Sequence, residues 1–247
     1  MCGGLFIWGV SDIAVNTYHV YSDKIKKPFT VAQISDAHFG LHLTKLKAQE
    51  MVILLMETDA DVIVSTGDFN SFIRLVDEQI VMGLFRHFTT DKKMYAVLGG
   101  HEFHYGLRYS LEFLRQCGFT VLRNILTRIS VNDNMVTIIG LEDNLPIPFH
   151  GSTDFCLALK HEPIEPEFPY DLMLAGHTHD GQGFPFVKSY YRGKYGETRK
   201  VFKGKRGRMF ISPGTGTWGI PLRLFSPPEI SVFKIAPMTA QDRGNPE

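Results

Sequence analysis

The stretch FTVAQISDAH at residues 29–38 decides the fold that we expect for this chain. Its first part is apolar and rich in β-branched residues, which is typical of a buried strand, and it stops at Asp36 and His38, two side chains that bind metals. The same arrangement recurs after further apolar runs at 61–66, 93–98, 154–160 and 171–175. Because ligands of an open α/β sheet gather beyond the carboxyl ends of its strands, we expect the polar side chains after these runs to meet at one edge.

The polar side chains at these strand ends are carboxylates and imidazoles. They are Asp36, His38, Asp68, His101, Glu102, His161, His177 and His179. A mixture of imidazole and carboxylate suits Mn, Fe, Zn or Co better than Mg or Ca. The pairs two residues apart can each face one ion, and a carboxylate such as Asp68 can bridge two cations about 3.5–4 Å apart. A lone histidine more often packs in a core, but five such islands after five apolar runs predict a metal site.

The pattern along the chain divides it into three parts. Residues 1–28 are expected to be an irregular or partly helical lead-in, 29–236 the folded domain, and 237–247 a polar tail that frays. Helices are expected at 44–57, 75–88 and 106–117, a hairpin at 128–131 and 135–141, and later strands at 208–212 and 229–235. Alternating strands and helices followed by closely spaced strands predict mixed sheets sandwiched between helices.

Composition limits the partners and the compartment. Lys plus Arg equals Asp plus Glu at 26 each, so no net charge draws the chain to nucleic acid, and we expect no specific nucleic-acid partner. Three scattered cysteines are too few for a disulfide framework. The most apolar stretch, 5–15, is too short for a membrane span and lacks the flanks of a signal peptide. We expect a soluble monomer at the periphery of a bacterial-type cell membrane or in the cytoplasm; the apolar start leaves open that 1–28 includes the remnant of an anchor region.

The order of the motifs carries a family resemblance. Read in sequence, D-x-H, GD, GGHE, H and GHTH resemble the calcineurin-like metallophosphoesterase superfamily over residues 29–236. The segments 176–182 and 214–229 resemble its YkuE-like branch, whose members are often associated with the membrane or envelope. The resemblance implies a single-domain four-layer α/β/β/α sandwich, in which two mixed β-sheets are flanked by helices.

The resemblance also implies two divalent transition-metal ions. Asp36, His38 and His179 would hold the first ion. His161 and His177 would hold the second, and Asp68 would bridge the two. Mn is the first expectation, with Fe, Zn or Co as alternatives. A hydroxide that bridges the two metals would attack phosphorus in line, and the cations would neutralise charge on the phosphoryl oxygens.

Two further roles and one departure follow from the same resemblance. His101 would contact the substrate phosphate and protonate the leaving group, and Glu102 would orient that imidazole and raise its pKa. The family has Asn before this histidine as a ligand of the second metal, where this chain has Gly100. We therefore expect a weaker second site, in which water, Asn70 or His104 replaces the missing ligand.

Two regions outside the motifs are open to more than one interpretation. The basic segment 188–208, with interleaved tyrosines, fits contact with substrate or with an anionic membrane surface, or else a solvated loop. Arg223 is a candidate phosphate clamp, because a guanidinium matches phosphate geometry, or it supports a loop. Asp143 is expected to be structural.

The favoured function is metal-dependent hydrolysis of a phosphodiester or pyrophosphate, with a substrate that is lipid-linked or contains a nucleotide. The resemblance to the branch offers an alternative enzyme, a UDP-2,3-diacylglucosamine-type lipid-precursor pyrophosphatase at the membrane surface. A different class of function is a degenerate envelope-binding module whose second metal site is impaired by Gly100.

Overall fold

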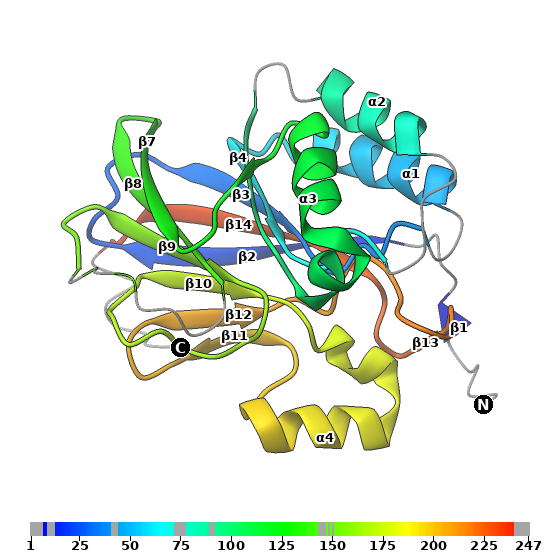
Figure 1. Cartoon of the computed structure of the whole chain (residues 1–247). Helices are drawn as coiled ribbons and strands as arrows, with labels where there is room; N and C mark the ends of the chain where they lie inside the picture. Colours follow the sequence, from blue (N-terminus) through cyan, green and yellow to red (C-terminus); the bar gives the residue numbers. More distant parts are fainter. Residues whose placement is uncertain are drawn as a thin grey trace.

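Two mixed six-stranded sheets face one another in the computed structural model, which describes residues 7–8, 13–40, 44–71, 78–88, 92–142, 147, 149 and 151–239 (Figure 1). The first sheet has the strand order β2-β14-β3-β4-β5-β6, and the second has the order β11-β12-β10-β9-β8-β7. A short antiparallel ribbon pairs β1 (Ile7–Trp8) with β13 (Arg223–Leu224).

The first sheet is covered by helices on its outer face (Figure 1). Its strands are β2 (Ala14–Ser22), β3 (Phe29–Ile34), β4 (Val62–Thr66), β5 (Lys93–Val97), β6 (Thr120–Val121) and β14 (Glu229–Pro237). The helices are α1 (Thr44–Glu57), α2 (Glu78–Phe88) and α3 (Gly100–Gln116). Met51, Phe85 and Phe113 project from these helices onto Ile34 and Ile63 of the sheet, and all five are buried. Because β3 to β6 run parallel, their carboxyl ends lie at one edge.

The second sheet packs its inner face on the first. Its strands are β7 (Ile125–Val131), β8 (Asn134–Leu141), β9 (Phe155–Lys160), β10 (Leu172–Ala175), β11 (Lys200–Lys203) and β12 (Arg208–Ile211). Val31 and Val64 meet Leu157, Leu172 and other apolar side chains in the core between the sheets. In the part of the chain that the structure describes, loop residues around Phe168 cover the outer face. The one-turn helix η1 (His179–Gly183) leads into α4 (Pro185–Tyr195) at the lower edge (Figure 1).

The predicted architecture of two mixed sheets flanked by helices is confirmed, and the helix at 44–57 begins and ends where the sequence predicted. The predicted lead-in is wrong in its structure, because Ala14–Ser22 forms β2 and pairs along its whole length with β14. Its alternating exposed and partly buried residues are typical of an edge strand, whose partner lies about two hundred residues further along the chain.

A second difference is α4, which lies where the sequence offered only a basic segment. Pro185 starts this helix at its first turn, a position where the missing N–H costs nothing. Asp143 and residues 240–247 of the expected tail lie outside the described residues. None of the helices in the described ranges is long and apolar enough to cross a bilayer.

Candidate metal centre

The six predicted metal ligands come together at the edge where the parallel strands of both sheets end. Asp36 and His38 follow β3, and Asp68 follows β4. His161 directly follows β9, and the GHTH segment at 176–179 follows β10. The convergence arises because β3 and β4 run parallel in one sheet, β9 and β10 run parallel in the other, and the two sheets face each other.

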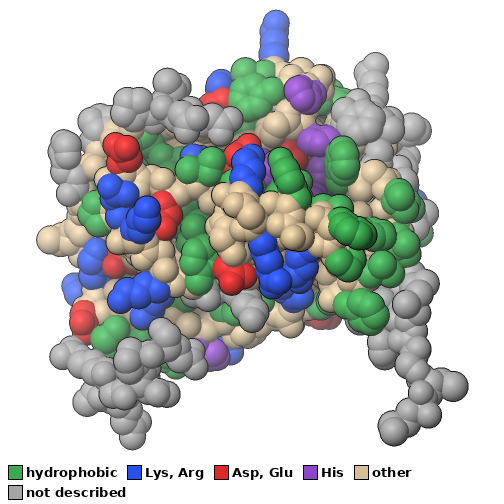
Figure 2. All heavy atoms as spheres, turned by 90° about the horizontal axis from the view of Figure 1, so that it is seen from below, with side chains coloured by type: hydrophobic (Ala, Val, Ile, Leu, Met, Phe, Trp, Pro, Cys, Tyr) green, Lys and Arg blue, Asp and Glu red, His purple; other side chains and the backbone are tan. Residues whose placement is uncertain are grey.

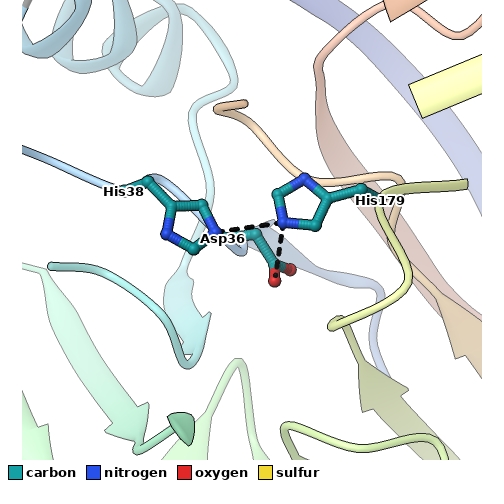
Figure 3. A group of neighbouring side chains, drawn as sticks. All are labelled: Asp36, His38 and His179. Carbon is teal, nitrogen blue, oxygen red and sulfur yellow. Dashed lines mark hydrogen bonds and ion pairs between the residues drawn. The ribbon is translucent and has the colours of Figure 1, made fainter. Parts of the chain in front are cut away.

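The first cluster consists of Asp36, His38 and His179 (Figure 3). The Nε2 atoms of His38 and His179 are 3.0 Å apart, and the Nε2 atom of His179 is 3.5 Å from Oδ1 of Asp36. All three side chains are buried. Two imidazole nitrogens and a carboxylate oxygen that face one another and are buried are a donor set for one cation.

The second cluster is built on Asp68. Its Oδ2 atom lies 3.2 Å from Nε2 of His161 and 4.0 Å from Nε2 of His101. His177 joins the cluster through its Nδ1 atom, 3.3 Å from Nε2 of His161. Asp68 also groups with His38 on one side and with Asp36 on the other, with all ligand atoms of each group within 4.8 Å of one another. It therefore occupies the position between the two clusters that a bridging carboxylate needs.

The backbone at the ligands is unusual. Five of the six predicted ligands, all except His161, have φ between 48° and 73°, a left-handed conformation that L-residues rarely adopt. Such conformations gather at functional sites, where the surroundings impose them. Glycines supply the remaining space: a methyl group at Gly176 would overlap the Asp36 carboxylate, and one at Gly99 would overlap that of Asp68.

Hydrogen bonds behind the ligands set their orientation. The Nδ1–H of His161 donates to the carbonyl of Thr66 over 2.8 Å, which directs Nε2 toward Asp68 and makes it the ring atom available to a metal ion. The backbone N–H of His177 donates to the Asp36 carboxylate over 3.0 Å, and the Ser35 hydroxyl donates to the same group. Partners of this kind fix the tautomer and the ring orientation of metal ligands.

The electrostatics of the cluster suit a cation. Burial lowers the pKa of His38 to about 3 and that of His177 to about 4, so both imidazoles are neutral ligands at pH 7. Burial also raises the pKa of Asp36, to about 6. Burial would lower the pKa of His161, but Asp68 and Asp36 outweigh it and raise this pKa to about 10. The carboxylates that hold a proton there would hold a metal ion in its place, so the donor set fits two transition-metal ions.

His101 lies in the cluster, and the neighbouring Glu102 contacts backbone groups. The side chain of His101 is 18% exposed, against at most 9% for those of Asp36, Asp68, His161 and His179, so a substrate can reach it. The Glu102 carboxylate is fully buried and accepts backbone N–H bonds from Asp68, Gly99 and Asn70 at 2.9, 2.7 and 3.0 Å. These contacts are with backbone groups, and the orientation of His101 by Glu102 stays a prediction. The pKa of His101 is lowered by burial rather than raised.

Arg223 is not a phosphate clamp. It is fully buried, and its guanidinium donates to the carbonyls of Gly216, Ser226 and Pro213 over 3.0, 3.2 and 2.7 Å. Its Nη2 atom lies 3.2 Å from Nδ1 of His179, on the side away from the cluster. The second interpretation from the sequence, support of a loop, agrees with these contacts, and no donor of this side chain faces solvent.

There is open space around Gly100, which stands where the family has Asn. A Cβ atom at this position would meet nothing within 4 Å. Of the two candidate replacements, Asn70 is buried and donates from Nδ2 to Ser110 over 3.4 Å, and its Oδ1 accepts no hydrogen bond from the residues that the structure describes. His104 is exposed on α3. Among the described residues, His104 belongs to none of the groups of His, Asp and Glu side chains that could hold a metal ion.

Sequence reasoning missed one residue and undervalued two others. Lys47 on α1 is fully buried and donates to the carbonyl of Ala37, which lies between two predicted ligands. A lysine among apolar helix residues gave no signal of this contact. The rings of Tyr191 and Tyr195 on α4 pack edge-on against His177, with centroids 5.7 and 6.0 Å away. Their spacing of four residues within the tyrosine-rich segment was the available signal.

Comparisons with known proteins agree with this geometry. The family described as calcineurin-like phosphoesterase matches residues 29–181. A metallophosphoesterase of Aquifex aeolicus is 30% identical and covers 90% of this chain and 92% of its own length. YkuE of Bacillus subtilis, also named a metallophosphoesterase, is 28% identical over 84% of this chain and 79% of its own. The chain spans 66% of a Helicobacter pylori relative that is 26% identical.

Among solved structures, a 5'-nucleotidase precursor from Thermus thermophilus has a TM-score of 0.48 and 13% identity, over 87% of this chain and 55% of that one. A TM-score below 0.5 is too low to carry any inference about substrate. The family match covers more than half of the chain. The chain therefore belongs to the calcineurin-like phosphoesterase family, a family of phosphoester hydrolases that depend on two metal ions.

Proposed function

We propose that this calcineurin-like phosphoesterase hydrolyses phosphodiester or pyrophosphate bonds at the cluster of Asp36, His38, Asp68, His161, His177 and His179. One observation supports this most strongly: Asp68 groups with His38 and His101 on one side and with Asp36 and His161 on the other. A single carboxylate shared by two imidazole-rich groups is the arrangement that a two-metal hydrolase requires. The preference for diesters and pyrophosphates rests on the resemblance to the YkuE-like branch.

The residues present fit two ions with mixed oxygen and nitrogen ligands. Asp36, His38 and His179 would hold the first, His161 and His177 the second, and Asp68 both. We propose Mn as the natural metal, with Fe, Zn or Co as alternatives, because this donor set suits first-row transition metals. Bound there, the two ions would supply positive charge for the phosphoryl oxygens and activation of water.

The chain's own residues would position the substrate and exclude water. His101 is partly exposed and neutral at pH 7, so its imidazole can donate one hydrogen bond to a phosphoryl oxygen. The negative charge of a bound phosphoester would favour the protonated ring, from which a proton can pass to the leaving group. Tyr191 and Tyr195 cover one side of His177 with their rings and restrict access of bulk water from that side.

We propose that the second metal site is weaker than in relatives that carry Asn before the catalytic histidine. The support is the open space at Gly100, which has no side chain to bind an ion. Water would complete the coordination, and the affinity for the second ion would fall. This proposal allows both a slow enzyme and a protein that binds only one ion.

A second candidate function is hydrolysis of a lipid-linked pyrophosphate. The observation that favours it is a group of exposed apolar side chains on α4 and on the loop that contacts Gln182, including Phe186, Trp218 and Ile220. A lipid substrate needs such a surface beside the reacting phosphate. A water-soluble diester would not need it.

The test is metal content by elemental analysis, run beside hydrolysis of bis-p-nitrophenyl phosphate with added Mn. We expect two metals per chain at saturating Mn, Mn-stimulated turnover, and a loss of about a hundredfold or more in His101→Ala with metal content unchanged. The matched control is His19→Ala, which removes an exposed histidine from β2 and should leave both readouts unchanged. One metal or none with no turnover would instead support the binding module.

A further inference from the structure

We propose that Tyr191 on α4 is a substrate-binding residue, whose phenolic hydroxyl donates a hydrogen bond to a phosphoryl oxygen of the phosphoester. This role rests on the proposed function, because it adds a contact to the same reaction at the same metal centre. The family match ends at residue 181, so nothing in that match gives Tyr191 a role.

The ring of Tyr191 lies against the predicted metal ligand His177. The two ring centroids are 5.7 Å apart, and the ring planes cross at 77°. Both side chains are partly exposed, whereas Asp36, Asp68 and His161 are buried. Seen from below, the side on which α4 lies, the molecule shows His side chains at its surface beside hydrophobic ones (Figure 2). Tyr191 therefore stands at an edge of the metal centre that a phosphoester can reach from solution.

The hydroxyl of Tyr191 is a donor without a protein acceptor among the described residues. The contrast is Tyr195, one turn further along α4, whose hydroxyl donates to Oε2 of Glu162 over 3.0 Å. A phenol donates one hydrogen bond, and the charged oxygens of a phosphoester accept such bonds strongly. The Tyr191 hydroxyl is therefore available to a substrate, and that of Tyr195 is not.

The charges that act on the two phenols show where each hydroxyl lies. Burial raises the pKa of Tyr191 above its ordinary value, and the negative charges of Asp36 and Asp68 raise it further. The pKa of Tyr195 is raised instead by burial and by Glu162. The Tyr191 hydroxyl thus lies within electrostatic reach of the two carboxylates of the metal centre. It also keeps its proton at pH 7, so it can donate.

An ion pair fastens the first turn of α4 to one ligand loop. Nζ of Lys188 lies 2.8 Å from Oδ1 of Asp180, which is the residue directly after the predicted ligand His179. The Asp180 carboxylate is buried, and it also accepts the Thr198 hydroxyl over 2.6 Å. Charge-assisted hydrogen bonds of this kind are strong and directional. The start of α4 is therefore fixed relative to the loop that carries His179.

The last turn of α4 is fastened to another ligand loop through Glu162, the residue directly after His161. Oε2 of Glu162 accepts the Tyr195 hydroxyl and lies 3.7 Å from Nζ of Lys194. Tyr191 lies between the two fastened turns, and its ring stacks on that of Tyr195 with centroids 6.2 Å apart. Its donor is therefore held in place before a substrate arrives, the condition under which a hydrogen-bond donor stabilises charge on a reacting group most effectively.

Tyr191 and His101 approach the metal centre from different helices. His101 comes from α3, and its Nε2 lies 4.0 Å from the Asp68 carboxylate, whereas Tyr191 comes from α4 and contacts His177. A phosphoester bound at the centre would have one protein donor from each helix. Loss of a hydrogen bond to a charged oxygen weakens binding about tenfold to a hundredfold.

The experiment compares Tyr191→Phe with the unchanged chain, both loaded with Mn. Hydrolysis of bis-p-nitrophenyl phosphate gives kcat and KM, and calorimetric titration with inorganic phosphate gives a binding affinity that needs no turnover. The substitution keeps the ring against His177 and removes only the hydroxyl. We expect kcat/KM and the affinity for phosphate each to fall about tenfold or more. Metal content and melting temperature should stay unchanged, because the hydroxyl has no protein partner among the described residues.

The matched control is Tyr190→Phe, which removes a hydroxyl from the neighbouring side chain, 64% exposed on the same helix, and should change none of these values. Unchanged phosphate affinity in Tyr191→Phe overturns the proposal even if turnover falls, because a substrate-binding donor must act on bound phosphate. Loss of metal from Tyr191→Phe also overturns it, since the side chain would then support the metal site. An equal effect of both substitutions overturns it as well.

Failure of this proposal and failure of the proposed function are distinguishable. If the chain binds phosphate, Tyr191→Phe weakens that binding and no variant hydrolyses the diester, the contact with phosphate is supported and the proposed hydrolysis is not. If the chain is active and Tyr191→Phe changes neither kcat/KM nor phosphate affinity, only the role of Tyr191 is overturned. A Mn-loaded chain that binds no phosphate overturns the role of Tyr191 too.

Discussion

Replacing Glu102 by alanine should destabilise the whole protein rather than only slow its chemistry. The Glu102 carboxylate is fully buried and accepts three backbone N–H groups, from Asp68, Asn70 and Gly99. These donors lie in the loop after β4, which carries Asp68, and in the loop after β5, just before His101 at the start of α3. Glu102→Ala would leave all three donors buried without an acceptor.

The expected loss of folding free energy follows from the number of N–H donors left without an acceptor. Each buried, unsatisfied donor costs about 1–3 kcal/mol, so three cost roughly 3–9 kcal/mol. A whole domain is stable by only about 5–15 kcal/mol, so Glu102→Ala should be largely unfolded or close to it. Glu102→Gln keeps one acceptor oxygen and should lose about 1–3 kcal/mol, because its amide group would face one N–H donor.

Urea unfolding in the presence of a chelator measures this without any contribution from bound metal. The matched control is Glu112→Ala, which removes an exposed carboxylate from the same helix and should change the free energy of unfolding by less than about 0.5 kcal/mol. If Glu102→Ala does not fold, the free energy of unfolding can still be measured for Glu102→Gln.

One pattern of results would refute this reasoning. If both Glu102 variants unfold like the unchanged chain while hydrolysis falls and its pH profile shifts, Glu102 acts on His101. The orientation role expected from the family resemblance would then be right after all, and the backbone contacts would be incidental.

Three further predictions each concern substitutions at one residue. Gly176→Ala should lower metal content by elemental analysis, because its methyl group would displace the Asp36 carboxylate; unchanged content would contradict the close approach. Gly100→Asn has open space for its side chain and should tighten the second metal in a competition with a chelator, whereas Gly100→Ala should not. Burial and then Arg223 lower the pKa of Lys47 to about 7. The unfolded chain therefore binds more protons at this group above pH 7, so stability should rise from pH 7 towards pH 10, and Lys47→Met should flatten that rise.

The local sequence pattern was sufficient to predict those parts of the fold in which interacting segments follow one another in a regular order along the chain. The apolar runs before Asp36 and Asp68 predicted parallel strands, and parallel strands bring their carboxyl ends together without further information. The helix at 44–57 was also predictable, because its apolar positions and polar start depend on neighbours only. The edge strand β2 was not, since it is held by a partner at the far end of the chain.

By itself, the sequence determined which side chains gather as candidate metal ligands, because their residue types and their places after buried strands can be read from it. Only the tertiary structure decided what the remaining charged groups do. The family resemblance assigned Glu102 to catalysis, and guanidinium chemistry made Arg223 a candidate phosphate clamp or a loop support. Both side chains are fully buried and hydrogen-bonded to backbone groups. A buried charge takes its role from the donors and acceptors that surround it in space, and these come from segments far apart in the chain.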